Sequence, residues 1–161
     1  MIIVVELDNL LFLHTPHTHM QKSKHTILYA EDDMDDLFIV KQAFEKHDHI
    51  EVLHASNGKE AIVQLEAMIR NDYFPCLVIL DINMPIMNGK EALQAIRKHQ
   101  QLQKLSVVLF STSNSVKDAE FAKNNNAELV TKPIEFGDLE EIARQFVNQC
   151  DFEINKLTIP Q

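Results

Sequence analysis

Charged and polar side chains follow four of the five short apolar runs of this sequence. The acidic pair Glu31 and Asp32 follows the first run, and one polar residue follows each of three later runs. These three are Asp81, Ser111 and Lys132. Carboxylates that are crowded together at low dielectric repel one another, so the acidic residues need a cation. A lysine and a hydroxyl beside such a group indicate chemistry on an anionic phosphoryl group.

The cation that suits these oxygens is Mg²⁺, which prefers one or two carboxylates together with water and phosphate oxygens. Asp32, Asp81 and a backbone carbonyl near Asn83 would hold the ion and leave coordination positions open. Asp81 can then attack a phosphoryl group as a carboxylate nucleophile, while Lys132 and the ion neutralise charge on the equatorial oxygens. Ser111 would donate a hydrogen bond to the product.

The elements that must position these residues alternate along the chain. From Thr26 onward, short apolar runs alternate with amphipathic stretches, a pattern typical of a parallel sheet covered by helices on both faces. We expect strands at 27–30, 50–55, 76–80, 107–110 and 128–131. Apolar residues at helical spacing mark two helices through Ala61, Leu65, Met68 and Ile69, and through Leu139, Ile142, Ala143, Phe146 and Val147.

The predicted fold class is α/β, a doubly wound five-stranded parallel sheet of flavodoxin-like order 2-1-3-4-5. Ligands of such sheets bind outside the carboxyl ends of the strands, where the strand order reverses. This order brings Asp32, Asp81, Ser111 and Lys132 together. Each residue alone has a plainer interpretation, as a helix N-terminal acid, an N-cap, a turn hydroxyl or an exit turn. Their joint occurrence at four strand ends favours a site.

Composition excludes several classes of protein. The formal net charge of −9 opposes binding to nucleic acid or anionic lipid. Cys76 and Cys150 are too far apart in sequence for a disulfide scaffold, and Cys76 begins an apolar run in which a thiol would pack. We therefore expect free thiols and a reducing cytoplasm.

Residues 1–24 form an N-terminal extension that we leave out of the fold prediction. The segment Ile2–Leu13 is mostly apolar, but it contains acidic residues, lacks a cationic leader and is too short to cross a bilayer. We interpret His14–His19 as a polar linker rather than a metal site, since no flanking residues complete a coordination sphere. A natural start at Met20 is an open alternative.

Residues 25–150 resemble the receiver domain of two-component response regulators. The resemblance rests on four stretches: Ile27–Asp33, Leu80–Pro85 with Asn88-Gly89, Phe110–Thr112 and Thr131–Pro133. It implies that Asp81 is the phospho-acceptor, Ser111 the switch hydroxyl and Lys132 the essential lysine. It also implies that Mg²⁺ is bound by Asp32, Asp81 and the backbone carbonyl of Asn83, with Glu31, the other member of the acidic pair, lying behind these ligands or acting through water. A cis peptide between Lys132 and Pro133 is implied as well.

The resemblance extends to stand-alone receivers that partner bacterial phytochromes. It implies phosphorylation by a sensor histidine kinase or phosphotransfer protein, and signalling through a downstream protein or a homodimer rather than catalysis on an outside substrate. The tail 151–161 is too short for an output domain.

Four positions depart from the family pattern: Ser106, Thr112, Asn126 and Leu129. Leu129 replaces the usual aromatic switch residue, so we expect a smaller or differently routed response there. Three alternatives remain. These are a degenerate receiver used only for interaction, an aspartyl-nucleophile phosphatase, in which Asn83 cannot serve as the general acid, and an FMN binder, whose phosphate the acidic loop would repel.

Overall fold

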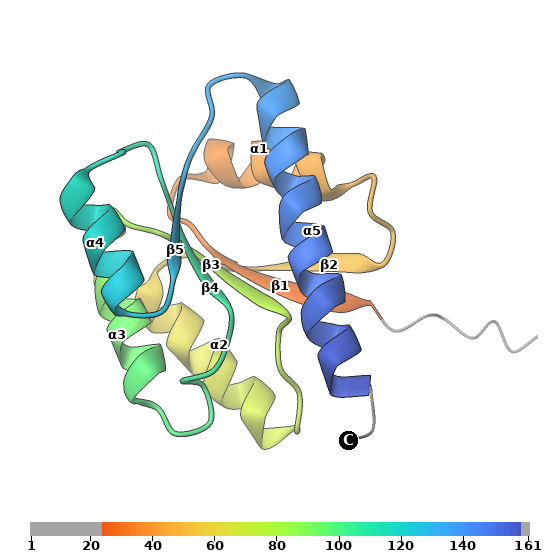
Figure 1. Cartoon of the computed structure of the whole chain (residues 1–161), viewed down its shortest axis with the longest axis vertical. Coiled ribbons are helices and arrows are strands. Elements are labelled where there is room, and N and C mark those ends of the chain that lie inside the picture. The colour runs from red at the N-terminus through yellow and green to blue at the C-terminus, as the bar shows by residue number, and fades with distance from the viewer. Residues whose placement is uncertain (1–23, 159–161) are drawn as a thin grey trace, which may run out of the picture.

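Five parallel strands form one sheet in the order β2-β1-β3-β4-β5, which confirms the predicted fold and topology (Figure 1). The computed structural model describes residues 24–158. The strands are β1 (His25–Ala30), β2 (Ile50–Ala55), β3 (Leu77–Asp81), β4 (Val107–Ser111) and β5 (Glu128–Thr131). Every residue of β3 and β4 is buried, as is typical of central strands that are covered on both faces.

Strands β3 and β4 each end one residue later than the sequence pattern predicts. The parallel ladder continues through these residues, with Asp81 opposite Phe110 and Ser111 opposite Thr131. Both polar residues therefore belong to the sheet itself. Their backbones are held by strand pairing rather than by a loop.

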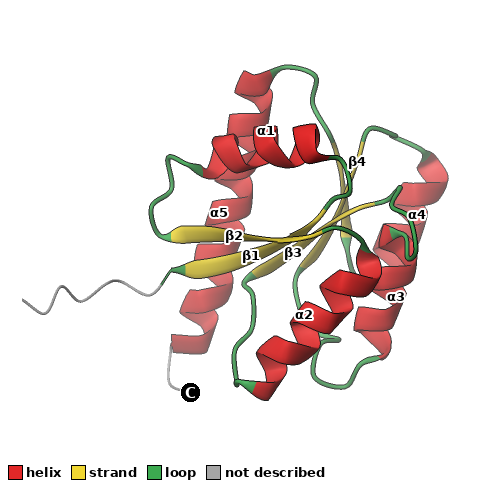
Figure 2. Ribbon diagram, turned by 180° about the vertical axis from the view of Figure 1, so that it is seen from behind, coloured by secondary structure: helices red, strands yellow, loops and turns green. Residues whose placement is uncertain are grey.

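Helices cover both faces of the sheet (Figure 2). The helices are α1 (Met34–Phe44), α2 (Gly58–Arg70), α3 (Gly89–Lys98), α4 (Val116–Asn124) and α5 (Phe136–Thr158). One apolar core lies between the sheet and α1 and α5, and the other lies between the sheet and α2, α3 and α4. The predicted apolar stripes of α2 and α5 face these cores, which confirms both helices.

Asparagine side chains begin two of the helices. Asn57 accepts a hydrogen bond from the backbone of Glu60, and Asn88 accepts one from the backbone of Glu91, each at 3.0 Å. The Glu91 carboxylate in turn accepts a hydrogen bond from the Asn88 backbone at 2.9 Å. This reciprocal capping fixes the start of α3 close to the end of β3.

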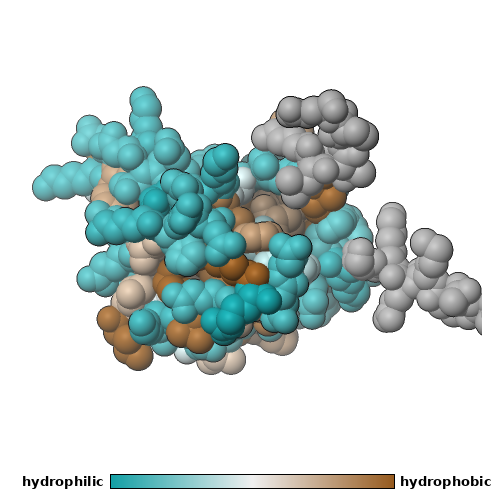
Figure 3. Space-filling view, turned by 90° about the horizontal axis from the view of Figure 1, so that it is seen from below, coloured by the Kyte–Doolittle hydropathy of each residue, from teal (hydrophilic) through white to brown (hydrophobic). Residues whose placement is uncertain are grey.

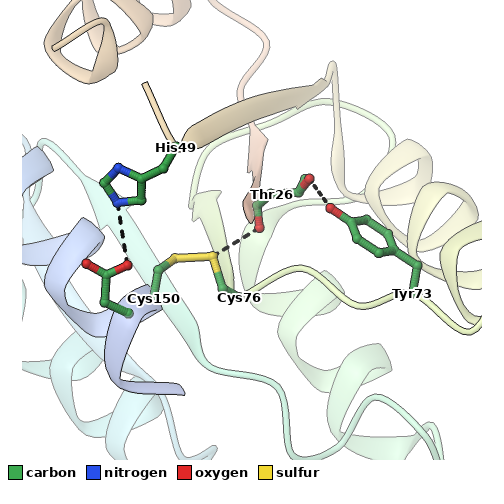
Figure 4. Close-up of a disulfide and its surroundings, with 6 residues drawn as sticks. Thr26, His49, Tyr73, Cys76 and Cys150 are labelled. Carbon is green, nitrogen blue, oxygen red and sulfur yellow. Dashed lines mark hydrogen bonds and ion pairs between the residues drawn. A yellow bond between two sulfur atoms is a disulfide. The ribbon is translucent and has the colours of Figure 1, made fainter. Parts of the chain in front are cut away.

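The prediction of free cysteines is wrong, because Cys76 and Cys150 form a disulfide with a Cα–Cα distance of 4.9 Å (Figure 4). Their separation of 74 residues in sequence hides their proximity in the fold. Cys76 lies just before β3, at the amino end of the sheet. Helix α5 starts at the carboxyl end and crosses the sheet face, which brings Cys150 back to that amino end.

The loop between β3 and α3 contains a strained residue, Ile86. Its φ of 68° lies in the left-handed region, which is unfavourable for a β-branched side chain. A hydrogen bond of 2.7 Å from the Met87 amide to the Pro85 carbonyl closes a γ-turn around it. Its side chain is 83% exposed and so gains little from burial.

Replacing Ile86 by glycine is expected to raise the free energy of unfolding by about 1 kcal/mol, because glycine adopts positive φ without steric cost. Urea denaturation measures this. Ile134→Gly is the matched control, since Ile134 is 98% exposed and does not have a positive φ. The control should lose roughly 0.5–1 kcal/mol through chain entropy. A loss of stability in both variants would contradict the assignment of strain.

The predictions for residues 1–23, including the linker and the alternative start at Met20, lie outside the described residues. At the other end, α5 continues through Cys150 to Thr158. The boundary predicted at residue 150 therefore falls within a helix. None of the helices in residues 24–158 is both long and apolar enough to span a membrane.

Candidate functional site

The predicted acidic residues meet at the carboxyl edge of the sheet. Carboxylate oxygens of Glu31, Asp32 and Asp81 all lie within 4.8 Å of one another. Glu31 and Asp81 are buried, whereas Asp32 is exposed. The cluster is therefore closed on the protein side and open to solvent at Asp32.

Lys132, which follows β5, is the cationic centre of this edge. Its Nζ lies 2.6 Å from Glu31 Oε2, 2.8 Å from Asp36 Oδ2 and 2.9 Å from Asp81 Oδ1. An ammonium has three N–H donors, so these carboxylates engage all of them. Burial lowers the pKa of Lys132, but the hydrogen bonds with Asp36, Asp81 and Glu31 outweigh it and raise that pKa above its ordinary value. The lysine is thus held in its charged form.

Tyr29 supports the acidic pair from within β1. Its hydroxyl donates a hydrogen bond of 2.5 Å to Glu31 Oε2, while the Asp33 amide donates one of 3.1 Å to Glu31 Oε1. Burial, followed by the charge of Glu31 and its hydrogen bond, raises the pKa of the Tyr29 phenol above its ordinary range. Tyr29 is therefore a neutral donor that fixes Glu31.

Sequence reasoning did not find the role of Tyr29. A signal for it exists, because Tyr29 precedes Glu31 by two residues and side chains two apart lie on the same face of a strand. A buried tyrosine needs a partner for its hydroxyl, and Glu31 is the nearest one along the chain.

The acidic run at the start of α1 has two roles. Asp33 is the N-cap, since its Oδ1 accepts hydrogen bonds of 2.8 and 3.2 Å from the Asp35 and Asp36 amides. The plainer interpretation of a helix N-terminus is thus correct for Asp33. Asp36, one turn into α1, instead reaches Lys132, and it was not among the predicted site residues.

Asp81 is fixed from both sides. Its Oδ1 contacts Lys132, and its Oδ2 accepts a hydrogen bond of 2.6 Å from the Asn83 amide. The side chain of Asn83 is exposed. The backbone at Asn83 therefore already orients Asp81 before any ligand binds.

Gly89 lies directly against the backbone of Asp81. A Cβ at Gly89 would stand 2.2 Å from the Asp81 carbonyl oxygen and 2.9 Å from its carbon. The Gly89 amide donates a hydrogen bond of 3.1 Å to the carbonyl of Ile82. A side chain here would collide with backbone that cannot move without displacing Asp81, a constraint that the sequence signal for a helix start does not reveal.

Ser111 ends β4 and is fully buried. Its Oγ accepts a hydrogen bond of 3.1 Å from the Ser113 amide, and its carbonyl accepts one of 2.8 Å from the Lys132 amide. The second bond joins the ends of β4 and β5, so it fixes the position of the Lys132 backbone. The hydroxyl hydrogen of Ser111 can still be donated.

Two of the expectations concern residues close to Lys132 in sequence, Pro133 and Leu129. The residues described contain no cis peptide bond, so the expectation of a cis peptide between Lys132 and Pro133 is wrong. A trans bond is the ordinary state of X–Pro.

Leu129 is half-buried and packs against the core under α2, α3 and α4. It lies opposite Leu109 in the ladder.

Comparisons with known proteins point to one family. Residues 27–144 match the response regulator receiver domain family. PilH of Pseudomonas aeruginosa is 29% identical over 110 residues, which cover 68% of this chain and 86% of PilH. The response regulator Rcp1 of Synechocystis sp. is 30% identical over 95 residues, which cover 57% of this chain and 65% of Rcp1.

Solved structures show the same fold. The phosphorylated cyanobacterial phytochrome response regulator RcpA aligns with a TM-score of 0.71 at 26% identity and covers 86% of this chain and 100% of its own. A Mn²⁺-bound form of Rcp1 aligns with a TM-score of 0.68 at 24% identity and covers 85% of this chain and 99% of its own.

Proposed function

Because the chain belongs to the response regulator receiver family of two-component signalling, we propose that Asp81 accepts a phosphoryl group and that the phosphorylated protein signals through a partner. The observation that carries this proposal is the buried ion cluster at the carboxyl edge. There Lys132 contacts Asp81 and Glu31 directly. Such a cluster combines a nucleophile with a fixed cation in one place.

The proposed transfer begins at a carboxylate oxygen of Asp81. That oxygen attacks phosphorus, the bond from phosphorus to the donor breaks, and its electron pair leaves with the donor. For a histidine kinase or a phosphotransfer protein, the leaving atom is an imidazole nitrogen. The Asn83 amide holds Asp81 Oδ2 at 2.6 Å, which reduces the rotational freedom that the nucleophile must lose.

Lys132 neutralises charge on the transferred group in this proposal. All three of its N–H donors are already engaged by carboxylates, so it must release one to bind a phosphoryl oxygen. Lys132 would exchange its contact with Asp81, since formation of the acyl phosphate removes the negative charge of that carboxylate. Glu31 and Asp36 then keep the ammonium in position.

Mg²⁺ fits the donor set, because three carboxylates converge and the side at Asp32 is open to solvent. We propose that Asp32, Asp81 and the backbone carbonyl of Asn83 hold it, with Glu31 acting through water. The ion would add positive charge beside the phosphoryl oxygens.

Ser111 is the proposed switch hydroxyl, which donates a hydrogen bond to the phosphoryl group. The side chain of Leu129 already packs into the apolar core, so we propose that the response depends on Ser111 and the segment after it more than on Leu129. A side chain whose burial hardly changes between two states contributes little to their balance.

The proposed partners are a sensor histidine kinase or phosphotransfer protein and a downstream protein, with a second copy of this chain as another partner. The net charge of −9 opposes direct binding of nucleic acid. We propose a cytoplasmic signalling protein that catalyses only its own phosphorylation and dephosphorylation. Asn83 cannot titrate, so a phosphatase that needs an acid at that position is disfavoured.

Incubation with acetyl phosphate and Mg²⁺ is expected to add one phosphoryl group, which intact-mass analysis detects. Asp81→Asn should remove the product, since an amide is not a nucleophile, and excess EDTA should greatly reduce it. Asp32→Asn should weaken the dependence on Mg²⁺. A degenerate receiver would show no product under any of these conditions.

Asp35→Asn is the matched control, because it removes one carboxylate of the same acidic run outside the cluster. It should be phosphorylated like the unaltered protein. A product that persists in Asp81→Asn, or that forms equally well in EDTA, would contradict the assignment of the nucleophile or of the metal.

A further inference from the structure

A cavity of about 420 Å³ lies at the amino end of the sheet, opposite the ion cluster. Its lining includes Thr26, Tyr73, Cys76, Lys104 and Leu105. Figure 3 views this end of the molecule and shows apolar surface recessed among hydrophilic side chains. Cys76, one partner of the disulfide, therefore borders a cavity large enough for a small molecule.

The two sulfurs of the disulfide differ in access. Cys76 is half-buried and lines the cavity. Cys150 is 0% exposed and lies within the apolar core under α5. Cys76 is therefore the half of the disulfide that a thiolate in the cavity would attack, and Cys150 would be the leaving group.

The reduced form would keep its packing. Cys76 Sγ lies 3.2 Å from the carbonyl oxygen of Thr26 (Figure 4), so a thiol at Cys76 has a hydrogen-bond acceptor in place. A thiol at Cys150 would remain among apolar side chains, where cysteine packs as a small hydrophobic residue. Neither sulfur needs the bond between them in order to be accommodated.

The charges around the cavity select the class of thiol. Among the residues that the structure describes, Lys24, His25 and Lys104 line it against a single acidic residue, Glu153. Two lysines favour a negatively charged thiol, in contrast with the acidic protein as a whole.

We propose that this cavity is a thiol-exchange site, in which a small thiol bearing carboxylates opens the Cys76–Cys150 disulfide by attack at Cys76. The thiolate sulfur bonds to Cys76 Sγ, the Sγ–Sγ bond breaks, and the electron pair leaves on Cys150 Sγ, which takes up a proton. A second thiolate attacks the small-molecule sulfur of the mixed disulfide and releases Cys76. Two small thiols are oxidised to their disulfide, and the protein disulfide is reduced.

Single-cysteine variants of the full chain test which sulfur is reached. Oxidised glutathione is the probe, and intact mass follows the mixed disulfide. Cys150→Ser leaves Cys76 in the cavity and should be modified at least about ten-fold faster than Cys76→Ser, whose remaining thiol is buried. Equal rates, or faster modification of Cys76→Ser, would overturn the proposal.

The unaltered protein provides a test that does not depend on folding of the variants. The rate at which reduced glutathione reduces the disulfide should rise in proportion to the glutathione concentration. At a fixed glutathione concentration, this rate should stay constant as urea is added below the unfolding transition. A rate that grows with urea along with global unfolding would show that the cavity gives no access.

Charge selection is tested with Lys104→Gln. It should slow reduction by glutathione about two- to three-fold relative to reduction by the cationic thiol cysteamine, compared at equal thiolate concentration. Lys41→Gln on α1 removes an exposed lysine away from the cavity and should leave this ratio unchanged. An unchanged ratio in Lys104→Gln would overturn the choice of an anionic thiol.

Discussion

Replacing Lys132 by methionine is expected to lower the free energy of unfolding by about 3–5 kcal/mol in metal-free buffer. The substitution keeps most of the side-chain volume and removes the charge shared by Glu31, Asp36 and Asp81. The Lys132 side chain is 11% exposed and that of Glu31 2%, so an uncompensated negative charge would be left in a buried place. Urea denaturation with EDTA present measures the loss.

Addition of Mg²⁺ should restore more stability to Lys132→Met than to the unaltered protein, because the cation would then be the only positive charge among the carboxylates. Lys46→Met is the matched control. Lys46 forms an ion pair of 2.6 Å with Glu140, but its side chain is 74% exposed, so the control should lose no more than about 1 kcal/mol. Equal losses in the two variants would mean that the cluster has no special energetic role.

Gly89→Ala is expected to lower the free energy of unfolding by about 1–3 kcal/mol, the usual range for forced overpacking. The new Cβ would meet the Asp81 carbonyl oxygen at 2.2 Å. Because the backbone of Asp81 must shift to relieve this contact, phosphorylation by acetyl phosphate should slow as well. Thermal or urea unfolding gives the first readout, and intact mass gives the second.

Gly137→Ala is the matched control, because the same chemical change should here raise the free energy of unfolding. Nothing lies within 4 Å of a Cβ at Gly137, and this residue is in the first turn of α5. Alanine should therefore stabilise the helix by roughly 0.5–1 kcal/mol. If both alanine variants were stabilised, the close approach at Gly89 would not constrain the protein.

The sequence predicted the sheet well because its signals are local. The runs that became β3 and β4 are short and apolar without alternation, which is typical of strands covered on both faces. The polar residues at the run ends supported the flavodoxin-like strand order, since that order makes neighbours of the strands that Asp81, Ser111 and Lys132 follow. The asparagine caps that begin α2 and α3 are local features as well.

Two of the features that sequence reasoning missed depend on contacts between distant segments. The pairing of Cys76 with Cys150 requires α5 to cross the whole sheet face, and Asp36 becomes part of the site only because α1 places it beside Lys132. The close approach at Gly89 likewise depends on how the loop after β3 folds back. In each case the residue type was ordinary, and its role came from a contact that the sequence pattern does not show.

The two tyrosines of this chain, Tyr29 and Tyr73, offer a native optical probe, since the chain contains no tryptophan to mask their emission. Tyr29 donates to Glu31 in the ion cluster, and Tyr73 shares a hydrogen bond with Thr26 beside the disulfide (Figure 4). Tyr29→Phe and Tyr73→Phe would each leave one emitter, so phenol fluorescence can follow either end of the sheet separately and without an added label.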